Sequence, residues 1–181
     1  SASMVEKSFT YDDVKRSYLE FIPSNHNIKA PINLVIGLHG YSGSASGFEK
    51  ETTGMFNKSA EKYEFIAIYP QGEYFYNDAN KDYSFISSWN AFPNKKPNKE
   101  FCSLDAVIYP KYPNCENSNR CSWTSCSDDL GFVKKIIDIS KENYLIDKVF
   151  VIGISNGGMM AQALACKYPN IFSGVINVVG M

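Results

Sequence analysis

The sequence predicts an α/β protein in which helices cover both faces of a mostly parallel β-sheet. Three observations support this fold class. Strand-sized apolar runs recur along the chain, segments with a helical period lie between them, and the two alternate through the C-terminal half. A chain of 181 residues is long enough for one domain with a substantial core, so we take residues 1–181 as a single domain.

The chain opens with a predicted hairpin. Glu6–Tyr11 and Val14–Ile22 alternate apolar and polar residues around Asp12 and Asp13, which is typical of two antiparallel strands at a sheet edge. Residues 31–38 are almost continuously apolar, which indicates a central strand buried on both faces.

A helix and a second buried strand are expected next. Phe48–Tyr63 has a helical pattern, although Gly54 weakens it. Phe65–Tyr69 is a short apolar run that Pro70 ends, so we interpret it as another interior strand.

From about residue 72 to 127 the sequence loses both periods and becomes rich in Asn, Lys, Tyr, Pro and Cys. Four of the five cysteines lie here: Cys102, Cys115, Cys121 and Cys126. Their spacing lacks the tight pairs and histidines of a metal site, so we expect no metal, and favour two disulfides with undetermined pairing. This stretch is interpreted as a cysteine-rich insertion over the active-site face, in a secreted protein or another oxidising compartment.

Regular structure resumes after the insertion. Ser127 can cap a helix whose first turn carries Asp128 and Asp129, and whose apolar face continues to about Tyr144. A strand at 149–154, a helix at 156–167 and an apolar strand at 174–179 complete the alternating order.

The most informative motif is Gly153-Ile154-Ser155-Asn156-Gly157, which lies between the strand at 149–154 and the next helix. This strand–turn–helix context is that of a nucleophile elbow, where a serine on a tight turn needs small neighbours on each side. Ser155 is therefore the predicted catalytic nucleophile, and the alternative is an ordinary tight turn.

A second glycine-rich turn follows the strand at 31–38. Its residues, Leu38-His39-Gly40-Tyr41, fit the loop that supplies an oxyanion donor in such hydrolases. We assign the predicted oxyanion hole to the backbone amides of Tyr41 and Asn156. His39 belongs to the turn itself, so a structural role is favoured over that of general base. Trp89 is either a core anchor or, tentatively, a wall of the substrate pocket.

The catalytic partners of Ser155 are not evident in the sequence. In this arrangement the acid and then the histidine follow the serine, but both histidines, His26 and His39, precede it. No Asp, Glu or His follows Ser155. We therefore expect the sheet to be truncated after the strand at 174–179. A C-terminal fragment of the same protein would then add the missing strands and the catalytic base and acid.

Composition excludes two partner classes. The 18 basic and 19 acidic residues give a net charge of −1 and form no basic block, so a nucleic-acid partner is not expected. The longest apolar runs have the length of strands, so no membrane-spanning helix is expected either.

Taken together, these segments resemble the esterase and polyhydroxybutyrate depolymerase family of α/β-hydrolases, close to the feruloyl and acetylxylan esterases of carbohydrate esterase family 1. The resemblance is carried by Leu38-His39-Gly40, Tyr69-Pro70-Gln71-Gly72, Ser88-Trp89-Asn90, Asp128-Asp129-Leu130-Gly131-Phe132, Ile146-Asp147-Lys148-Val149-Phe150, the motif from Gly153 to Met160, and Ala165-Cys166-Lys167-Tyr168-Pro169.

The resemblance implies a serine carboxylic-ester hydrolase that forms an acyl-enzyme on Ser155 and needs no cofactor. Esters on plant polysaccharide are the first expected substrates, and hydroxyalkanoate polyesters the next. A peptidase or thioesterase on the same fold is a further alternative. A non-catalytic binding module derived from a hydrolase would also account for a chain that lacks its base.

Overall fold

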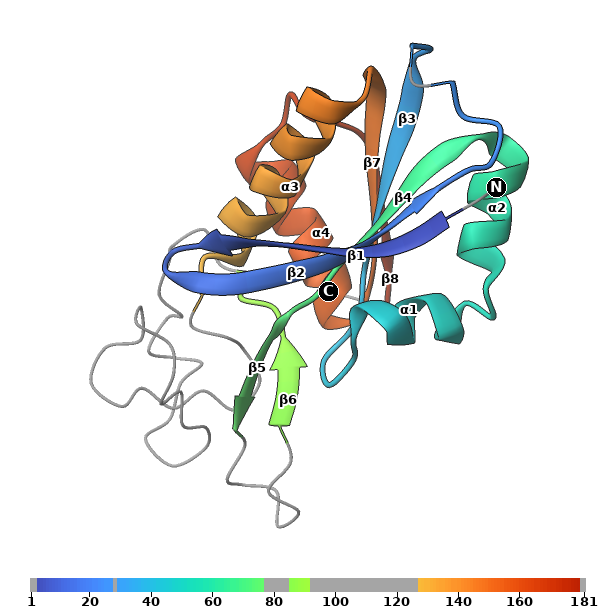
Figure 1. Ribbon diagram of the computed structural model, residues 1–181. Coiled ribbons are helices and arrows are strands. Elements are labelled where there is room, and N and C mark those ends of the chain that lie inside the picture. The colour runs from blue at the N-terminus through green and yellow to red at the C-terminus, as the bar shows by residue number, and fades with distance from the viewer. Residues whose placement is uncertain (1–2, 28, 77–84, 92–126, 180–181) are drawn as a thin grey trace.

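A computed structural model describes residues 3–27, 29–76, 85–91 and 127–179 of the chain (Figure 1). Its main feature is a six-stranded sheet in the order β1-β2-β4-β3-β7-β8. The strand β3 pairs in parallel with β4 and β7, and β7 pairs in parallel with β8, whereas β1, β2 and β4 pair antiparallel. The strands are β1 Ser3–Tyr11, β2 Val14–Ile22, β3 Ile32–Leu38, β4 Phe65–Pro70, β7 Ile146–Ile154 and β8 Phe172–Val178.

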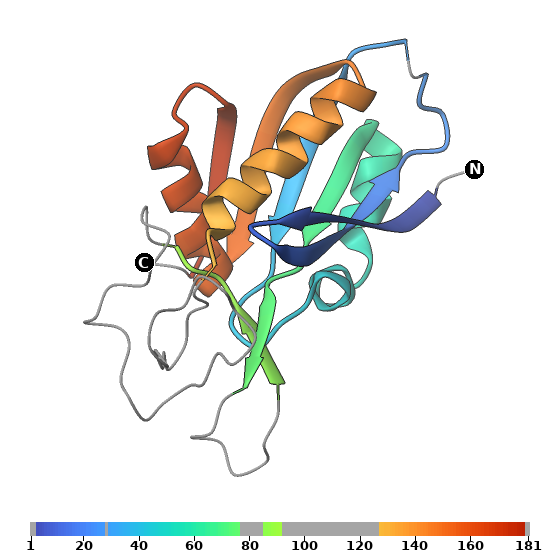
Figure 2. The same ribbon diagram turned by 60° about the vertical axis from the view of Figure 1, so that its left-hand side comes forward.

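Helices cover both faces of this sheet, as predicted (Figures 1 and 2). The helices α1 (Ala45–Glu51) and α2 (Met55–Tyr63) lie on one face, where Phe48, Ala60 and Tyr69 form a small core. The larger core lies under α3 (Asp129–Asn143) and α4 (Asn156–Lys167) on the opposite face. None of the helices in the described ranges has the length and hydrophobicity needed to cross a membrane.

The N-terminal hairpin is confirmed as an edge element. The strands β1 and β2 pair along their whole length, and Asp12 and Asp13 form the tight turn between them with φ angles of 49° and 63°. Positive φ at both central positions is the geometry that matches the twist of a two-residue hairpin.

The single helix expected at 48–63 is wrong, because two helices occupy this region. The first begins earlier, at a Ser44 N-cap whose Oγ accepts from the Gly47 N–H at 2.9 Å. Thr53 and Gly54 then adopt φ angles of 54° and 68°, which end α1 and allow α2 to start in a new direction.

The expected lack of regular structure after Gln71 also needs correction. A second, two-stranded sheet lies there, formed by β5 (Glu73–Tyr76) and β6 (Phe85–Ser88). Figure 2 shows this hairpin beyond the end of the main sheet. The four cysteines of the predicted insertion, Cys102, Cys115, Cys121 and Cys126, lie outside the described residues, as does the disulfide prediction.

The start of α3 differs from the prediction by one residue. Asp128, not Ser127, is the N-cap, and its Oδ1 accepts from the Gly131 N–H at 3.2 Å. Asp129 does not act through the helix dipole alone, because it is fully buried and its Oδ1 contacts Arg16 Nη2 at 2.8 Å. The guanidinium also contacts the Glu73 carboxylate at 2.9 Å, which ties β2, β5 and α3 together.

Candidate active site

Ser155 lies in a strained turn between β7 and α4. Its backbone angles are φ 54° and ψ −118°, and its side chain is exposed. A non-glycine residue in such a sparsely populated conformation costs about 1–3 kcal/mol, so the surrounding structure must hold it there. The strained, exposed serine at the end of a parallel strand is the geometry predicted for a nucleophile elbow.

The glycines around Ser155 are required by close backbone contacts. A β-carbon on Gly153 would lie 1.9 Å from the carbonyl oxygen of Gly157. A β-carbon on Gly157 would lie 2.2 Å from the carbonyl oxygen of Leu38. Since backbone atoms cannot move aside as a flexible side chain can, the elbow packs against the end of β3 only because both positions lack a side chain.

The helix α4 begins directly after Ser155. The N–H groups of Gly158 and Met159 donate to the Ser155 carbonyl at 2.8 and 3.1 Å. The Asn156 amide lies at the start of this 12-residue helix, where an N–H has no acceptor within the helix and carries the positive end of the dipole. It is therefore suited to stabilise an oxyanion that forms beside Ser155.

The glycine-rich turn after β3 lies against the turn that carries Ser155. A β-carbon on Gly40 would lie 3.2 Å from the Ile154 carbonyl oxygen and 3.5 Å from Ser155 Cβ. Tyr41 follows Gly40 in the chain and is 39 % exposed. The approach of the two turns brings the predicted donors of Tyr41 and Asn156 to the same end of the sheet.

Hydrogen bonds to β6 and within the turn itself fix the shape of the turn at residues 39–43. The Ser42 N–H donates to the Ser87 carbonyl at 2.8 Å, and Ser87 Oγ donates to the Gly43 carbonyl at 2.7 Å. The Gly43 N–H also donates to the Gly40 carbonyl at 3.0 Å. Ser87 was not identified from the sequence, because its partners are 44 and 45 residues away along the chain.

His39 has a structural role in this turn. Its ring is buried, Nδ1 lies 2.8 Å from the Gly40 carbonyl oxygen, and Nε2 lies 3.0 Å from the Gly72 nitrogen. Because the Gly72 N–H must donate, Nε2 is the acceptor and the proton lies on Nδ1. Burial lowers the pKa of His39 to about 4, so the neutral ring persists at physiological pH. Both nitrogens are occupied, which excludes His39 as the base in this conformation.

Trp89 is a core anchor, and its tentative assignment to a substrate-pocket wall is corrected. The side chain is fully buried, and its indole N–H donates to the His39 carbonyl at 2.8 Å. The indole ring also lies against the His39 ring, with centroids 4.8 Å apart. A bulky aromatic with a hydrogen-bonded N–H beneath the turn supports the site from inside rather than lining it.

The edge strand β8 also holds the elbow. The Ser155 N–H donates to the Val178 carbonyl at 2.8 Å, immediately after the parallel pairing of β7 with β8 ends. Apolar side chains of β8 remain accessible, with Val175 37 % and Ile176 58 % exposed. In the described part of the chain, β8 pairs with β7 alone.

The structure brings together the predicted nucleophile and both oxyanion turns, but not a complete catalytic set. Among the described residues, no hydrogen bond engages the Ser155 side chain, and no group of three His, Cys, Asp or Glu residues forms a metal-binding cluster. The part of the chain that the structure describes therefore places the exposed Ser155 beside the turn at 39–43, without a histidine or carboxylate bonded to the Ser155 side chain.

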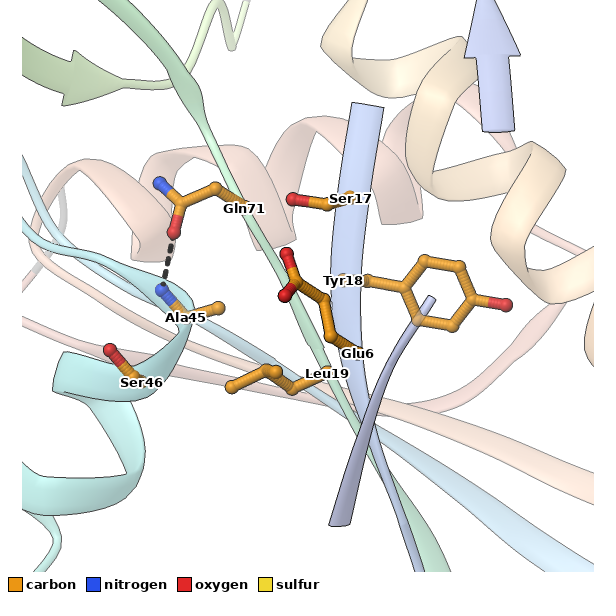
Figure 3. A pocket seen from close by; sticks show the side chains of 7 residues that line it. All are labelled: Glu6, Ser17, Tyr18, Leu19, Ala45, Ser46 and Gln71. Atoms are coloured by element: carbon orange, nitrogen blue, oxygen red, sulfur yellow. Dashed lines mark hydrogen bonds between the residues drawn. The ribbon is translucent and has the colours of Figure 1, made fainter. Parts of the chain in front are cut away.

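A separate polar pocket lies between the N-terminal hairpin and the start of α1 (Figure 3). Glu6, Ser17 and Gln71 contribute polar groups to it, and the Ala45 N–H donates to Gln71 Oε1 at 2.9 Å across one side. Its lining includes no residue of the elbow or of the turn at 39–43. We therefore do not assign this pocket to the reacting ester.

Known proteins with similar sequences are esterases and depolymerases. No protein-family model matches the chain. It is 27 % identical over 157 residues to a probable acetylxylan esterase A of Aspergillus fumigatus, which covers 86 % of the chain and 32 % of that protein. It is 32 % identical over 83 residues to poly(3-hydroxyalkanoate) depolymerase C of Paucimonas lemoignei, covering 41 % of the chain and 20 % of the relative. A feruloyl esterase B of Neurospora crassa is 37 % identical over 73 residues, or 36 % of the chain and 25 % of the relative. The chain thus spans about a third or less of these proteins.

Solved structures agree on the fold. A thermostable esterase superposes with a TM-score of 0.59 and 18 % identity, over 96 % of this chain and 40 % of that one. A poly(3-hydroxybutyrate) depolymerase from Bordetella parapertussis superposes with a TM-score of 0.57 and 14 % identity, over 97 % of this chain and 51 % of that one. The chain therefore has the α/β-hydrolase fold, and parts of its sequence are similar to an acetylxylan esterase, a feruloyl esterase and a poly(3-hydroxyalkanoate) depolymerase.

Proposed function

We propose that the protein is a serine carboxylic-ester hydrolase whose nucleophile is Ser155. The observation that carries this proposal is the backbone of Ser155 at φ 54° and ψ −118°, between a parallel strand and a helix. The fold does not require this strained, exposed conformation, whereas a nucleophile elbow does. Relatives named as esterases support the ester as the bond that is cleaved.

In the proposed reaction, Ser155 Oγ attacks the ester carbonyl, and the amide N–H groups of Tyr41 and Asn156 stabilise the oxyanion. Collapse of the tetrahedral intermediate releases the alcohol and leaves an acyl group on Ser155, which water then removes. Loss of one donor from such an oxyanion hole costs about 3–4 kcal/mol of transition-state stabilisation. No step requires a cofactor.

The base and acid belong to a segment outside residues 1–181 in this proposal. The segment would pair with the side of β8 that has no partner strand among the described residues, and would continue the sheet there; Val175 and Ile176 of β8 are exposed. A histidine on it would take the proton from Ser155 Oγ and pass it to the leaving alcohol, oriented by a neighbouring carboxylate. A C-terminal part of the same protein is the proposed source.

The proposed substrates are acyl or aryl esters on plant polysaccharide, with short hydroxyalkanoate polyesters as the second candidate. Two of the named relatives are an acetylxylan esterase and a feruloyl esterase, and another is a poly(3-hydroxyalkanoate) depolymerase. A secreted protein, or one in another oxidising compartment, would meet both kinds of substrate.

Labelling with a fluorophosphonate, read by intact mass under denaturing conditions, tests the proposal. The protein is used in its native form, with any polypeptide that accompanies residues 1–181. We expect one adduct on the wild type and none on Ser155→Ala. The matched control, Ser46→Ala, changes another exposed serine, on α1, and should label fully. Labelling that survives Ser155→Ala, or its absence from the wild type, would overturn the proposal and favour a non-catalytic module.

A further inference from the structure

We infer that Trp89 is a positioning residue that sets the placement of the two oxyanion donors relative to each other. The donors belong to turns that follow different strands, since Tyr41 follows β3 and Asn156 follows β7. Trp89 belongs to neither turn, yet it is hydrogen-bonded to both. The inference rests on the proposed function, which gives the two backbone amides their role.

The indole of Trp89 holds the turn after β3. Its Nε1–H donates to the His39 carbonyl at 2.8 Å, two residues before the Tyr41 amide. The fully buried ring also contacts the His39 ring at an interplanar angle of 34°, and His39 in turn bonds Gly40 and Gly72. A shift of the indole would therefore move the peptide that leads into the first donor.

The backbone of Trp89 holds the elbow. Its N–H donates to Asn156 Oδ1 at 2.7 Å, and its carbonyl accepts from Asn156 Nδ2 at 3.2 Å. The buried side-chain amide of Asn156 thus bonds both backbone groups of Trp89, as the backbone of a neighbouring strand would. This pairing fixes the side chain of the same residue whose backbone N–H is the second donor.

Trp89 is itself fixed from the opposite side. The N–H of the next residue, Asn90, donates to Asp129 Oδ2 at 2.7 Å, and Asn90 Nδ2 donates to the Ser127 carbonyl at 3.1 Å. Asp129 is fully buried, and its other oxygen binds Arg16. The main chain of Trp89 is consequently attached to α3 and β2, so it provides a rigid reference for both turns.

Such a reference matters because an oxyanion hole works by preorganisation. Donors aimed at the developing charge accelerate the reaction only if they need no rearrangement as it forms. A displacement of about 1 Å in the supporting structure can cost about 100-fold in rate. A residue that links both donors should therefore affect turnover without touching the substrate.

The test compares Trp89→Phe with Tyr69→Phe in the active protein. Trp89→Phe keeps an aromatic ring but removes the donor to His39. Tyr69→Phe is the matched control, since Tyr69 is also fully buried and donates one side-chain hydrogen bond, to Asn57 on α2. We expect kcat to fall about 10- to 100-fold in Trp89→Phe with KM within about 2-fold, and kcat to stay within about 2-fold in Tyr69→Phe. Equal kcat in both variants would overturn the inference.

Hydrogen exchange provides a readout that does not depend on catalysis. The Asn156→Ala variant keeps the backbone amide but removes both bonds to Trp89. In this variant and in Trp89→Phe, exchange should accelerate in residues 39–43 and in the first turn of α4, while α2 stays unchanged. Unaltered exchange in both turns would contradict the inference. If the wild type neither hydrolyses esters nor labels, the proposed function is refuted, and exchange changes in the two variants would then show only that Trp89 links the two turns structurally.

Discussion

Gly153 and Gly157 approach each other so closely that a β-carbon on the first would lie 1.9 Å from the carbonyl oxygen of the second. This contact closes the turn that carries Ser155. The strained conformation of Ser155 thus depends on the absence of side chains at Gly153 and Gly157. Although Ser155 itself is exposed, even an alanine at Gly153 or Gly157 would disturb the backbone that carries it.

Gly153→Ala should abolish fluorophosphonate labelling of Ser155, because the new methyl group forces the elbow apart. It should also lower the free energy of unfolding by at least the ~1–3 kcal/mol typical of overpacked sites. Gly174→Ala is the control, since its β-carbon would meet the Phe150 ring at 2.8 Å, a side chain that can move. Urea denaturation and intact mass measure both effects, and full labelling of Gly153→Ala would contradict the prediction.

Asp129→Asn should destabilise the fold by about 3–5 kcal/mol, because it leaves the buried Arg16 guanidinium without one of its two carboxylate partners. Asp138→Asn breaks the half-exposed pair with Lys134 on the same helix and should cost only about 0.3–0.5 kcal/mol. Chemical denaturation of both variants measures the difference. Similar losses in the two would show that the buried network contributes no more than a surface pair.

Acid should destabilise the protein through His39. The folded state depresses the pKa of this ring from 6.5 to about 4, so the unfolded chain binds the proton first as pH falls. The stabilisation is complete above pH 6.5 and is lost between pH 6.5 and about 4, a loss of about 3 kcal/mol. Denaturation curves at pH 7 and pH 4 should show this extra loss in the wild type and not in His39→Gln, whereas His26→Gln should retain it.

The hairpin turn offers a stabilising substitution. Asp13 adopts a φ of 63°, which glycine accepts without the steric cost of a β-carbon. Asp13→Gly should raise the free energy of unfolding by about 1 kcal/mol, since Asp-Gly is a preferred pair in such turns. Asp13→Ala should lower it instead. Thermal denaturation distinguishes the two, and a Gly variant no more stable than the Ala variant would refute this explanation.

Much of the main sheet and the two turns of the site could be predicted because their signals are local. The run from β7 through Ser155 to α4 carries its strand, its turn glycines and its helix within about 20 consecutive residues. The hairpin around Asp12 and Asp13 and the interior strand β3 have equally direct patterns. Each of these predictions depended on neighbours in sequence, which is where periodicity carries information.

The errors concern residues whose partners are distant in sequence. Asp129 lies in the first turn of α3, as the sequence predicts, but Arg16, 113 residues away, also makes it part of a buried network. The sequence does not predict the role of Trp89, because that role depends on hydrogen bonds to His39 and Asn156, which are distant in the chain. The strand β5 is short and has no apolar pattern that would predict it. Its residue Glu73 forms an ion pair with Arg16, which is distant in the sequence.

The bond between the Ser155 N–H and the Val178 carbonyl has a consequence for dynamics. Among the described residues β8 pairs with β7 alone, and backbone groups bonded to a strand become exposed when that strand opens. Each transient detachment of the end of β8 would release the amide of the nucleophile and relax its strained φ angle. Amide exchange at Ser155 should therefore follow the opening of β8 rather than that of β3.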